Sequence, residues 1–485
     1  MKKQPRPNIL FVIADQWRGD CLSITGHPVV ETPNLDMVAR RGIVFTSAFS
    51  SCPSCVAARA SLFTGLAPSS HGRLGYQDRV PWRYNHMLAQ ELGNAGYQTY
   101  CIGKTHFYPQ RAHLGFQGLE SYEGKHNHDG GYINDYWEWL KSRTSGTGEE
   151  NAHGLSHNGW PARPSHLPDE LHNNSWVAER AEEFLKRRDP TRPFFLNLSF
   201  HRPHPPIDPP RVYWDMYQNQ TLPEVPKGDW AKKHAVPVNH VDAWHGDFDP
   251  RHIDRARRGY YAQVSHIDNQ IGRVLSSISR LRCGPLMIVF TSDHGEMLGD
   301  HNLYRKTYAY EGSARVPLIV SMPEAPKAKP AVVDIPAVLE DVYPTILDAA
   351  SVDRPAHYRI DGVSLLPLYQ GRDAEQESGD GSREFVHGEH SACYDPANAM
   401  QFLTDGRVKY IWNPVTGGEY LFDRANDPDE LHDISRAPES LDMLEHWRGR
   451  LIDGLAERPQ DGLSDGKRLI SGSSPPAVRP ELLDQ

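Results

Sequence analysis

Two cysteines and an arginine lie close together in one short segment of this chain. Residues 51–65 read S-C-P-S-C-V-A-A-R-A-S-L-F-T-G. This pattern predicts a short apolar helix that begins near Cys55 and ends at Gly65. A cysteine at a helix N-terminus lies beside unpaired backbone N–H groups and the positive end of the helix dipole, which stabilise a thiolate or a docked anion. Arg59 follows one turn later on the same face.

Three interpretations of Cys52 and Cys55 are compatible with this segment. They are buried small apolar residues, or they form a redox-active C-x-x-C pair of the kind found in small βαβ domains, or Cys55 is the precursor of a modified nucleophile. The position of Arg59 distinguishes the two cysteines, because it follows Cys55 by four residues whereas the same offset from Cys52 reaches Val56. Cys55 is therefore the candidate for the chemistry.

Further ionisable side chains stand where apolar segments end. Such uninterrupted runs are typical of strands buried on both faces, and they cover residues 8–15, 97–104, 193–201, 285–293 and 317–322. The first four runs end in Asp15-Gln16, Lys104-Thr105-His106, His201-Arg202-Pro203-His204 and Asp293-His294. In an open α/β sheet the ligand site lies beyond the carboxyl ends of the strands, so we expect these groups to converge.

Carboxylates and a histidine at these strand ends predict a metal site. Suitable ligands for a hard divalent cation such as Ca²⁺, Mg²⁺ or Mn²⁺ are Asp15, Asp293 and His294. A second group in a His- and Gly-rich segment comprises His126, His128 and Asp129. For that group we favour solvated or substrate-contacting loop residues over a second metal site.

Helical patterns separate the apolar runs and predict a mainly parallel α/β sheet. They cover residues 34–41, 84–93, 173–187 and 255–278, and two polar, aromatic-rich stretches at 121–167 and 221–251 are expected to be surface loops that frame the mouth of the site. A polar, Gly-rich segment at 371–382 indicates a boundary. We therefore expect a first domain over 1–375, a smaller one over 376–470, and a flexible tail over 471–485.

The smaller domain is expected to be an antiparallel sheet covered by a helix. Strands at 400–404 and 407–412 flank the turn Asp405-Gly406, and a further strand fits residues 419–423. An amphipathic helix follows, with one apolar face made of Leu441, Leu444, Trp447, Leu451 and Leu455.

Composition narrows the class of partner. The chain has 485 residues and a formal net charge of −10, which argues against nucleic acid or an anionic membrane as a partner. No stretch approaches the ~18 apolar residues of a membrane span, six scattered cysteines do not form a disulfide framework, and no signal region is seen. We therefore expect a cytoplasmic protein.

One long block connects these observations to a known family. Residues 291–319 read T-S-D-H-G-E-M-L-G-D-H-N-L-Y-R-K-T-Y-A-Y-E-G-S-A-R-V-P-L-I. With N-I-L-F-V-I-A-D-Q, C-V-A-A-R-A-S-L-F-T-G, I-G-K-T-H-F and R-P-H-P-P, this block resembles the type I sulfatases of the alkaline phosphatase superfamily, in the family's order over nearly the whole chain. The resemblance implies a large, mainly parallel mixed sheet sandwiched by helices, with a smaller C-terminal antiparallel sheet and helix.

The resemblance also implies a role for each matching position. Cys55 matches the cysteine that a formylglycine-generating maturation enzyme oxidises to the nucleophile, and Arg59 matches the arginine that braces it. Lys104, His106 and Lys306 match groups that hold the sulfate and the second hydroxyl, and His204 matches the histidine that protonates the leaving alcohol. The implied ligands of one divalent ion, Ca²⁺ before Mn²⁺ or Mg²⁺, are Asp15, Gln16, Asp293, His294 and the modified residue 55.

The chain departs from the usual family pattern at several positions. Ala57 stands where the pattern Cys-x-Pro-x-Arg has proline, Ala58 stands where serine is frequent, and Asp15-Gln16 replaces a common Asp-Asp. The Asp-Gln and Asp-His pairs of this chain are similar to those of the phosphonate monoester hydrolases. Phosphonate or phosphodiester cleavage with Mn²⁺ is therefore the nearest competing function. A non-catalytic, glycan-binding pseudosulfatase is the next competing function.

The leading hypothesis is a sulfuric ester hydrolase that cleaves a sulfate monoester. Tyrosine, tryptophan and histidine in the 121–167 segment suit sugar faces and hydroxyls, so a sulfated carbohydrate is favoured over a small aryl or alkyl sulfate. The expected partners are thus a small-molecule or oligosaccharide sulfate ester and the maturation enzyme. The oligomeric state, including a homo-oligomer, is left open.

Overall fold

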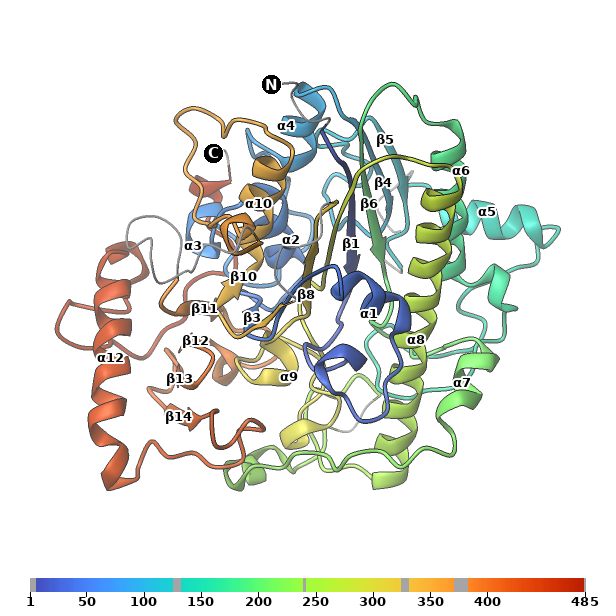
Figure 1. Cartoon of the computed structure of the whole chain (residues 1–485). Helices are drawn as coiled ribbons and strands as arrows, with labels where there is room; N and C mark the ends of the chain where they lie inside the picture. Colours follow the sequence, from blue (N-terminus) through green and yellow to red (C-terminus); the bar gives the residue numbers. More distant parts are fainter. Residues whose placement is uncertain (1–5, 125–131, 239–240, 324–330, 370–382, 484–485) are drawn as a thin grey trace.

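A computed structural model describes residues 6–124, 132–238, 241–323, 331–369 and 383–483. A large mixed sheet with helices on both faces forms the main body, and a smaller sheet lies beside it (Figure 1). This architecture confirms the fold class expected from the sequence.

The large sheet has eight strands in the described chain. In spatial order they are β5 (Gly118–Ser121), β4 (Gln98–Gly103), β6 (Phe194–Phe200), β1 (Asn8–Ala14), β7 (Leu286–Thr291), β8 (Leu318–Ser321), β2 (Gly42–Phe45) and β9 (Ala331–Val333). The strands β5, β4, β6, β1 and β7 are mutually parallel. Since β8 is antiparallel to both β7 and β2, the sheet is mixed at this edge. The five predicted strands are thus confirmed, and β2, β5 and β9 were not predicted.

Alternate residues of the central strand supply two separate cores. Ile9 and Phe11 of β1 pack on one face, whereas Leu10 and Val12 pack on the other, and all four are fully buried. A period of two on a strand covered on both sides explains the unbroken apolar run. Each such side chain contributes about 1.5–3 kcal/mol when it is removed from water.

Helices cover both faces of the sheet (Figure 1). The first face carries α2 (Cys55–Thr64), α4 (Leu88–Asn94) and α10 (Val342–Ala349). The second face carries α1 (Pro33–Ala39), α6 (Asn173–Arg187) and the long α8 (Pro250–Arg280). Shorter helices lie in the connections: α3 (Pro68–His71), α5 (Asp135–Arg143), α7 (Arg211–Tyr217), α9 (Glu311–Ala314) and α11 (Leu366–Tyr369).

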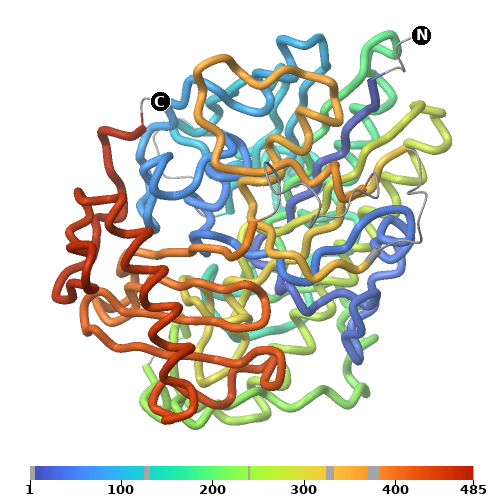
Figure 2. Tube along the Cα trace, turned by 60° about the vertical axis from the view of Figure 1, so that its left-hand side comes forward, coloured from blue at the N-terminus to red at the C-terminus, as the bar shows by residue number. Residues whose placement is uncertain are grey.

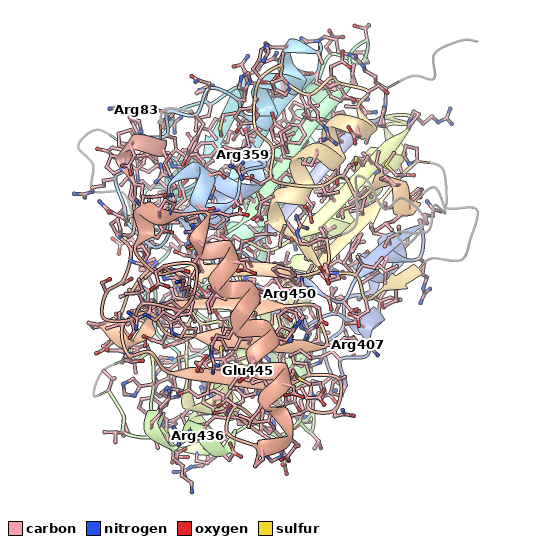
Figure 3. All side chains as sticks on the ribbon, turned by 90° about the vertical axis from the view of Figure 1, so that its left-hand side faces the viewer. Arg83, Arg359, Arg407, Arg436, Glu445 and Arg450 are labelled. Carbon is pink, nitrogen blue, oxygen red and sulfur yellow. The ribbon has the colours of Figure 1, made fainter. Side chains whose placement is uncertain are left out.

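The smaller sheet is antiparallel and lies under one helix. Its strands are β11 (Val386–His390), β12 (Met400–Thr404), β13 (Val408–Trp412) and β14 (Glu419–Asp423), and the helix is α12 (Leu441–Ala456). Figure 3 shows α12 across the strands, with Glu445 and Arg450 on it. Four of the five predicted apolar residues of α12 are buried, but Leu441 is 49% exposed because it stands at the first position of the helix.

A buried ionic cluster connects the smaller sheet to the main body. Lys409 of β13 is fully buried, and its ammonium lies 2.6 Å from Glu311 Oε1 and 2.8 Å from Glu430 Oε1. Arg424 lies 2.6 Å from the other oxygen of Glu311. Burial opposes ionisation of Glu311, but Arg424 and Lys409 lower the pKa of its carboxyl to about 2. Lys409 also donates to the carbonyl of Ala309, so the segment before α9 is held by the smaller sheet.

The end of the chain differs from the expected flexible tail. Val478 and Leu483 are buried in the main core, and Val478 forms a bridge with Arg73 next to α3. Figure 2 shows the C-terminus beside N-terminal segments in blue. The apolar side chains of an otherwise polar tail explain this packing.

Several expectations fall outside the described residues. The boundary between residues 375 and 376 lies within 370–382, and the histidine-rich group of His126, His128 and Asp129 lies within 125–131. The division into domains therefore stays a proposal. Among the described residues, no helix combines the length and the apolar character that a membrane span requires.

Candidate active site

Four parallel strands end at one edge of the sheet, and each carries predicted site residues just beyond its last residue. Asp15 follows β1, Lys104 follows β4, His204 lies four residues after β6, and Asp293 lies two residues after β7. All four side chains are at least 90% buried. The convergence expected at the strand ends is therefore present.

The predicted helix after the cysteine segment is α2, and it brings Cys55 to the same edge. Ser54 is its extended N-cap, Cys55 is its first residue, and Gly65 ends it with a φ of 74°. Burial and Asp15 oppose ionisation of Cys55, yet Lys104 and neighbouring cations lower the pKa of its thiol well below the usual value. By contrast, burial and nearby glutamates raise the pKa of the Cys52 thiol. The thiol pKa values of the two cysteines are thus shifted in opposite directions. The lowered pKa belongs to Cys55, the cysteine that the spacing of Arg59 indicates.

Four ligand-type side chains meet in a group suited to a metal ion. The ligand atoms of Asp15, Cys55, Asp293 and His294 all lie within 4.8 Å of one another. Nδ1 of His294 lies 2.9 Å from the carbonyl of Gly295, which fixes the proton on Nδ1 and turns the lone pair of Nε2 toward the group. Nε2 lies 3.1 Å from Cys55 Sγ. Two carboxylates and one imidazole nitrogen are a donor set that fits a divalent cation.

Two buried cations hold the carboxylates of this group. Arg59 Nε donates to Asp293 Oδ2 over 2.9 Å, and its Nη1 donates to the Lys104 carbonyl at 2.8 Å and to Ser199 Oγ at 2.9 Å. The ammonium of Lys104 donates to Asp15 Oδ2. Burial lowers the pKa of Lys104, but Asp15 raises it above the usual value. Arg59 is fully buried, so it contacts the strand ends rather than the open part of the site.

Lys306 connects Gln16 with His204. Its Nζ lies 2.8 Å from Gln16 Oε1 and 2.8 Å from His204 Nε2. Because Nδ1 of His204 lies 2.8 Å from the Pro205 carbonyl, Nδ1 carries the proton and Nε2 accepts from Lys306. Burial and Lys306 lower the pKa of His204 well below its usual value. The amide oxygen of Gln16, expected as a metal ligand, accepts from Lys306 in this structure.

His106 is held by two acidic residues that the sequence did not identify. Its Nε2 lies 3.0 Å from Asp78 Oδ1, and its backbone N–H donates to Glu123, which also accepts from the backbone of Thr105. The backbone φ of His106 is 59°, so Glu123 holds a turn in the left-handed region. Burial lowers the pKa of His106, but the hydrogen bond to Asp78 raises it to about 9.

A cavity of about 130 Å³ opens over these groups. The predicted residues that line it are Cys55, Lys104, His106, His204 and Lys306, together with His201. Residues without a sequence-based assignment are Ser54, Tyr76, His157, Asn158, Arg305, Thr307, Cys393 and Tyr394.

The stretches 121–167 and 221–251, which were expected to frame the mouth of the site, contribute unequally to the cavity lining. His157 and Asn158 of the 121–167 stretch line the cavity, although 135–143 of that stretch forms α5. In the other stretch, the Trp244 carbonyl accepts from Tyr308. That second stretch therefore contacts the loop beyond Lys306, and none of its described residues lines the cavity.

Comparison with protein families identifies the class to which this site belongs. The family model "Sulfatase" matches residues 7–352, and the model "N-sulphoglucosamine sulphohydrolase, C-terminal" matches residues 299–456. This chain belongs to the sulfatase family. An arylsulfatase from Clostridium perfringens is 38% identical over 96% of this chain and 98% of its own length. A choline-sulfatase from Rhizobium meliloti is 29% identical over 89% of this chain and 83% of its own.

Solved structures agree with this assignment. A phosphonate monoester hydrolase of Agrobacterium radiobacter has a TM-score of 0.76 and 26% identity, covering 94% of this chain and 96% of its own. The fold is shared with a protein solved with its substrate D-glucosamine-2-N,6-O-disulfate, at a TM-score of 0.72 and 20% identity, covering 96% of this chain and 100% of that one. The chain is a sulfuric ester hydrolase.

Proposed function

We propose that this sulfatase cleaves its substrate with a formylglycine formed from Cys55. The observation that carries the proposal is the place of Cys55, at the start of α2, beside a cation site and within the lined cavity. As a hydrated aldehyde, residue 55 would supply one hydroxyl that attacks sulfur and a second whose deprotonation re-forms the aldehyde and releases sulfate. The maturation enzyme that forms it must accept Ala57 in place of proline.

The cation site is assigned to Asp15, Asp293, His294 and residue 55, with Gln16 as an adjacent oxygen donor. We propose Ca²⁺ as the ion because carboxylate oxygens favour a hard cation, and Mn²⁺ is the second choice. A bound cation would polarise a sulfate oxygen and offset the charge that develops on it. Burial and the neighbouring Asp15 raise the pKa of Asp293, and a bound divalent cation would offset both effects.

The chain's own cations bind the sulfate group in this proposal. Lys104 and Lys306 line the cavity and supply ammonium groups to the sulfate oxygens. Arg59 is a positioning residue, because its guanidinium holds Asp293 and the carbonyl of Lys104 but does not line the cavity.

Two histidines have different roles, His204 as the proton donor and His106 as a positioning cation. His204 protonates the leaving oxygen from Nε2, the nitrogen that faces Lys306. A sulfate anion bound between Lys104 and Lys306 adds negative charge where these ammoniums now lower the imidazole pKa, so substrate binding raises that pKa. His106, whose pKa is about 9, is cationic at neutral pH and orients the second hydroxyl of residue 55.

A sulfated carbohydrate is the proposed substrate class. The cavity lining combines Tyr76, Tyr394, His157 and Asn158, which present aromatic faces and amide groups to a sugar ring and its hydroxyls. Relatives include an ulvan-active sulfatase from Formosa agariphila, 27% identical over 98% of this chain and 86% of its own length. A glycan-binding protein without activity is disfavoured, since each catalytic role has a residue of the required type.

The test combines mass spectrometry with sulfate release. The protein is expressed with a formylglycine-generating enzyme, and the peptide that spans Cys55 is measured for conversion of the thiol to the aldehyde. Cys55→Ala is expected to abolish sulfate release, whereas the matched control Cys52→Ala is expected to keep it. Full activity of Cys55→Ala would overturn the proposed nucleophile.

Phosphonate monoester or phosphodiester hydrolysis is the second candidate function. Two observations favour it, the structural similarity to a phosphonate monoester hydrolase and the Asp15-Gln16 pair. Comparison of kcat/KM for a sulfate monoester and for a phosphodiester with the same leaving group separates the two functions. A higher value for the phosphodiester would make the second candidate the main activity.

A further inference from the structure

We propose that Arg305 binds a second anionic group of the substrate and thereby selects sulfate esters that carry two negative charges. This inference rests on the proposed function, because it assigns a substrate class to the same cavity. The second group is a carboxylate or a second sulfate, both of which present coplanar or tripodal oxygens to a guanidinium.

The guanidinium of Arg305 lies in the cavity wall and lacks a full set of partners. Its Nε is buried and has no hydrogen-bond partner. Its Nη1 donates to the carbonyl of Asp242 over 3.1 Å. Within the described ranges, no carboxylate lies within ion-pair distance of Arg305. A buried donor without a partner costs roughly 1–3 kcal/mol, so the guanidinium is held in a place that does not satisfy all of its donors.

The orientation of the guanidinium is fixed from two sides. Its Cζ lies 4.6 Å from the centre of the Tyr394 ring, which also lines the cavity. The backbone N–H of Arg305 donates to Glu296, and its carbonyl accepts from Met297 over 2.8 Å. Because a stacked guanidinium on a fixed backbone loses little further freedom on binding, the site is preorganised for an anion.

Arg305 is a cation of the cavity lining that the bound sulfate group does not use. A sulfate monoester has one negative charge, and the proposal already assigns Lys104 and Lys306 to its oxygens. Among the described residues that line the cavity there is no carboxylate, so the lining is cationic. Lys306 faces Gln16 and His204, whereas the adjacent Arg305 packs on Tyr394, so the two cations serve different parts of the cavity.

The test compares substrates that differ only in the second charge. Sulfate release is measured with a monosulfated disaccharide that contains a uronate, with its carboxyl-reduced counterpart, and with a disulfated and a monosulfated form of one amino sugar. Wild-type protein is expected to prefer the dianionic member of at least one pair. Arg305→Gln is expected to reduce that preference roughly 10- to 100-fold, the loss expected for a charged, bidentate contact.

A matched control is Arg255→Gln. Arg255 also stacks at 4.6 Å on an aromatic ring, that of Trp214, and donates to a backbone carbonyl, but it does not line the cavity. It is expected to leave the preference unchanged. Arg305→Lys is expected to restore part of the preference, because it keeps the charge but not the fork.

Two outcomes would overturn the inference: an equal loss with Arg305→Gln on mono- and dianionic substrates, or no preference in the wild type. Calorimetric binding of the same saccharides to unconverted, Ca²⁺-loaded protein tests this inference separately from the proposed function. If no ester is turned over but the dianionic saccharide binds more tightly and Arg305→Gln removes the difference, then the inference holds without the proposed chemistry.

Discussion

Glu340 is expected to destabilise the native protein above neutral pH. It belongs to the 3₁₀ helix η5 (Leu339–Asp341) and is 3% exposed. One carboxylate oxygen accepts from Ser51 Oγ over 2.6 Å, while the other has no hydrogen-bond partner. Burial raises the pKa of its carboxyl to about 7 although the hydrogen bond from Ser51 lowers it. Because Ser51 lies in the segment that leads to Cys55, ionisation of the Glu340 carboxyl acts on a hydrogen bond of that segment.

The magnitude follows from the two pKa values. The unfolded chain loses the proton near 4.5 and the native protein near 7, so stability is lost as pH rises between these values. At pH 8 the loss amounts to about 3 kcal/mol, and at pH 5 it is less than about 1 kcal/mol. Glu340→Gln keeps an oxygen that accepts from Ser51 and removes the charge. The variant is therefore expected to gain about 3 kcal/mol at pH 8 and little at pH 5.

The assay is urea unfolding followed by tryptophan fluorescence at pH 5 and pH 8, with Ca²⁺ present throughout. Exposed Glu439 provides the control, because Glu439→Gln changes a carboxyl that is already in water. An equal effect of Glu340→Gln at both pH values, or a loss of stability at pH 8, would refute the reasoning.

Three further predictions concern charge elsewhere in the molecule. Activity is expected to fall above about pH 9 as His106 loses its proton. Asp78→Asn removes the hydrogen bond that raises this pKa, so the alkaline limb of the pH–rate profile should move toward neutral pH. An alkaline limb that does not move would contradict the role of His106. Chelation of divalent ions is expected to lower Tm, with recovery when Ca²⁺ is returned, because an ion that binds the native site and not the unfolded chain stabilises the native protein. Calorimetry with and without chelator measures this shift, and an unchanged Tm would contradict the proposed cation site. Lys409→Met is expected to cost about 3–5 kcal/mol in urea unfolding, and addition of Glu430→Gln to recover part of it.

The parts of the fold that the sequence predicted are those with the strongest periodic signal. The runs that became β1, β6 and β7 consist mostly of apolar residues, and this pattern needs no tertiary information. The strands β2, β5 and β11 were missed because G-I-V-F, G-L-E-S and V-H-G-E-H are short or polar, and only pairing with neighbouring strands makes them strands.

For the site, residue types at strand ends predicted which side chains converge, but not what holds them. Glu123 lies two residues beyond β5, and that strand end would have been the signal had β5 been recognised. Arg305 and Tyr394 come from segments far apart in the sequence, and nothing in either segment indicates that their side chains stack. The partners of Gln16 likewise depend on the tertiary placement of Lys306 and Glu296.

The ionic cluster of Lys409, Glu311 and Glu430 has a consequence for how such proteins can be cut or recombined. A chain ended before β11 would leave Glu311 without Lys409 and Arg424, five residues beyond Lys306. The cluster therefore couples the segment that follows Lys306 to the small sheet, because Glu311 loses two of its cationic partners when that sheet is removed. A chimera that exchanges the small sheet has to keep partners for Glu311, either by retaining residues equivalent to Lys409 and Arg424 or by replacing Glu311 as well.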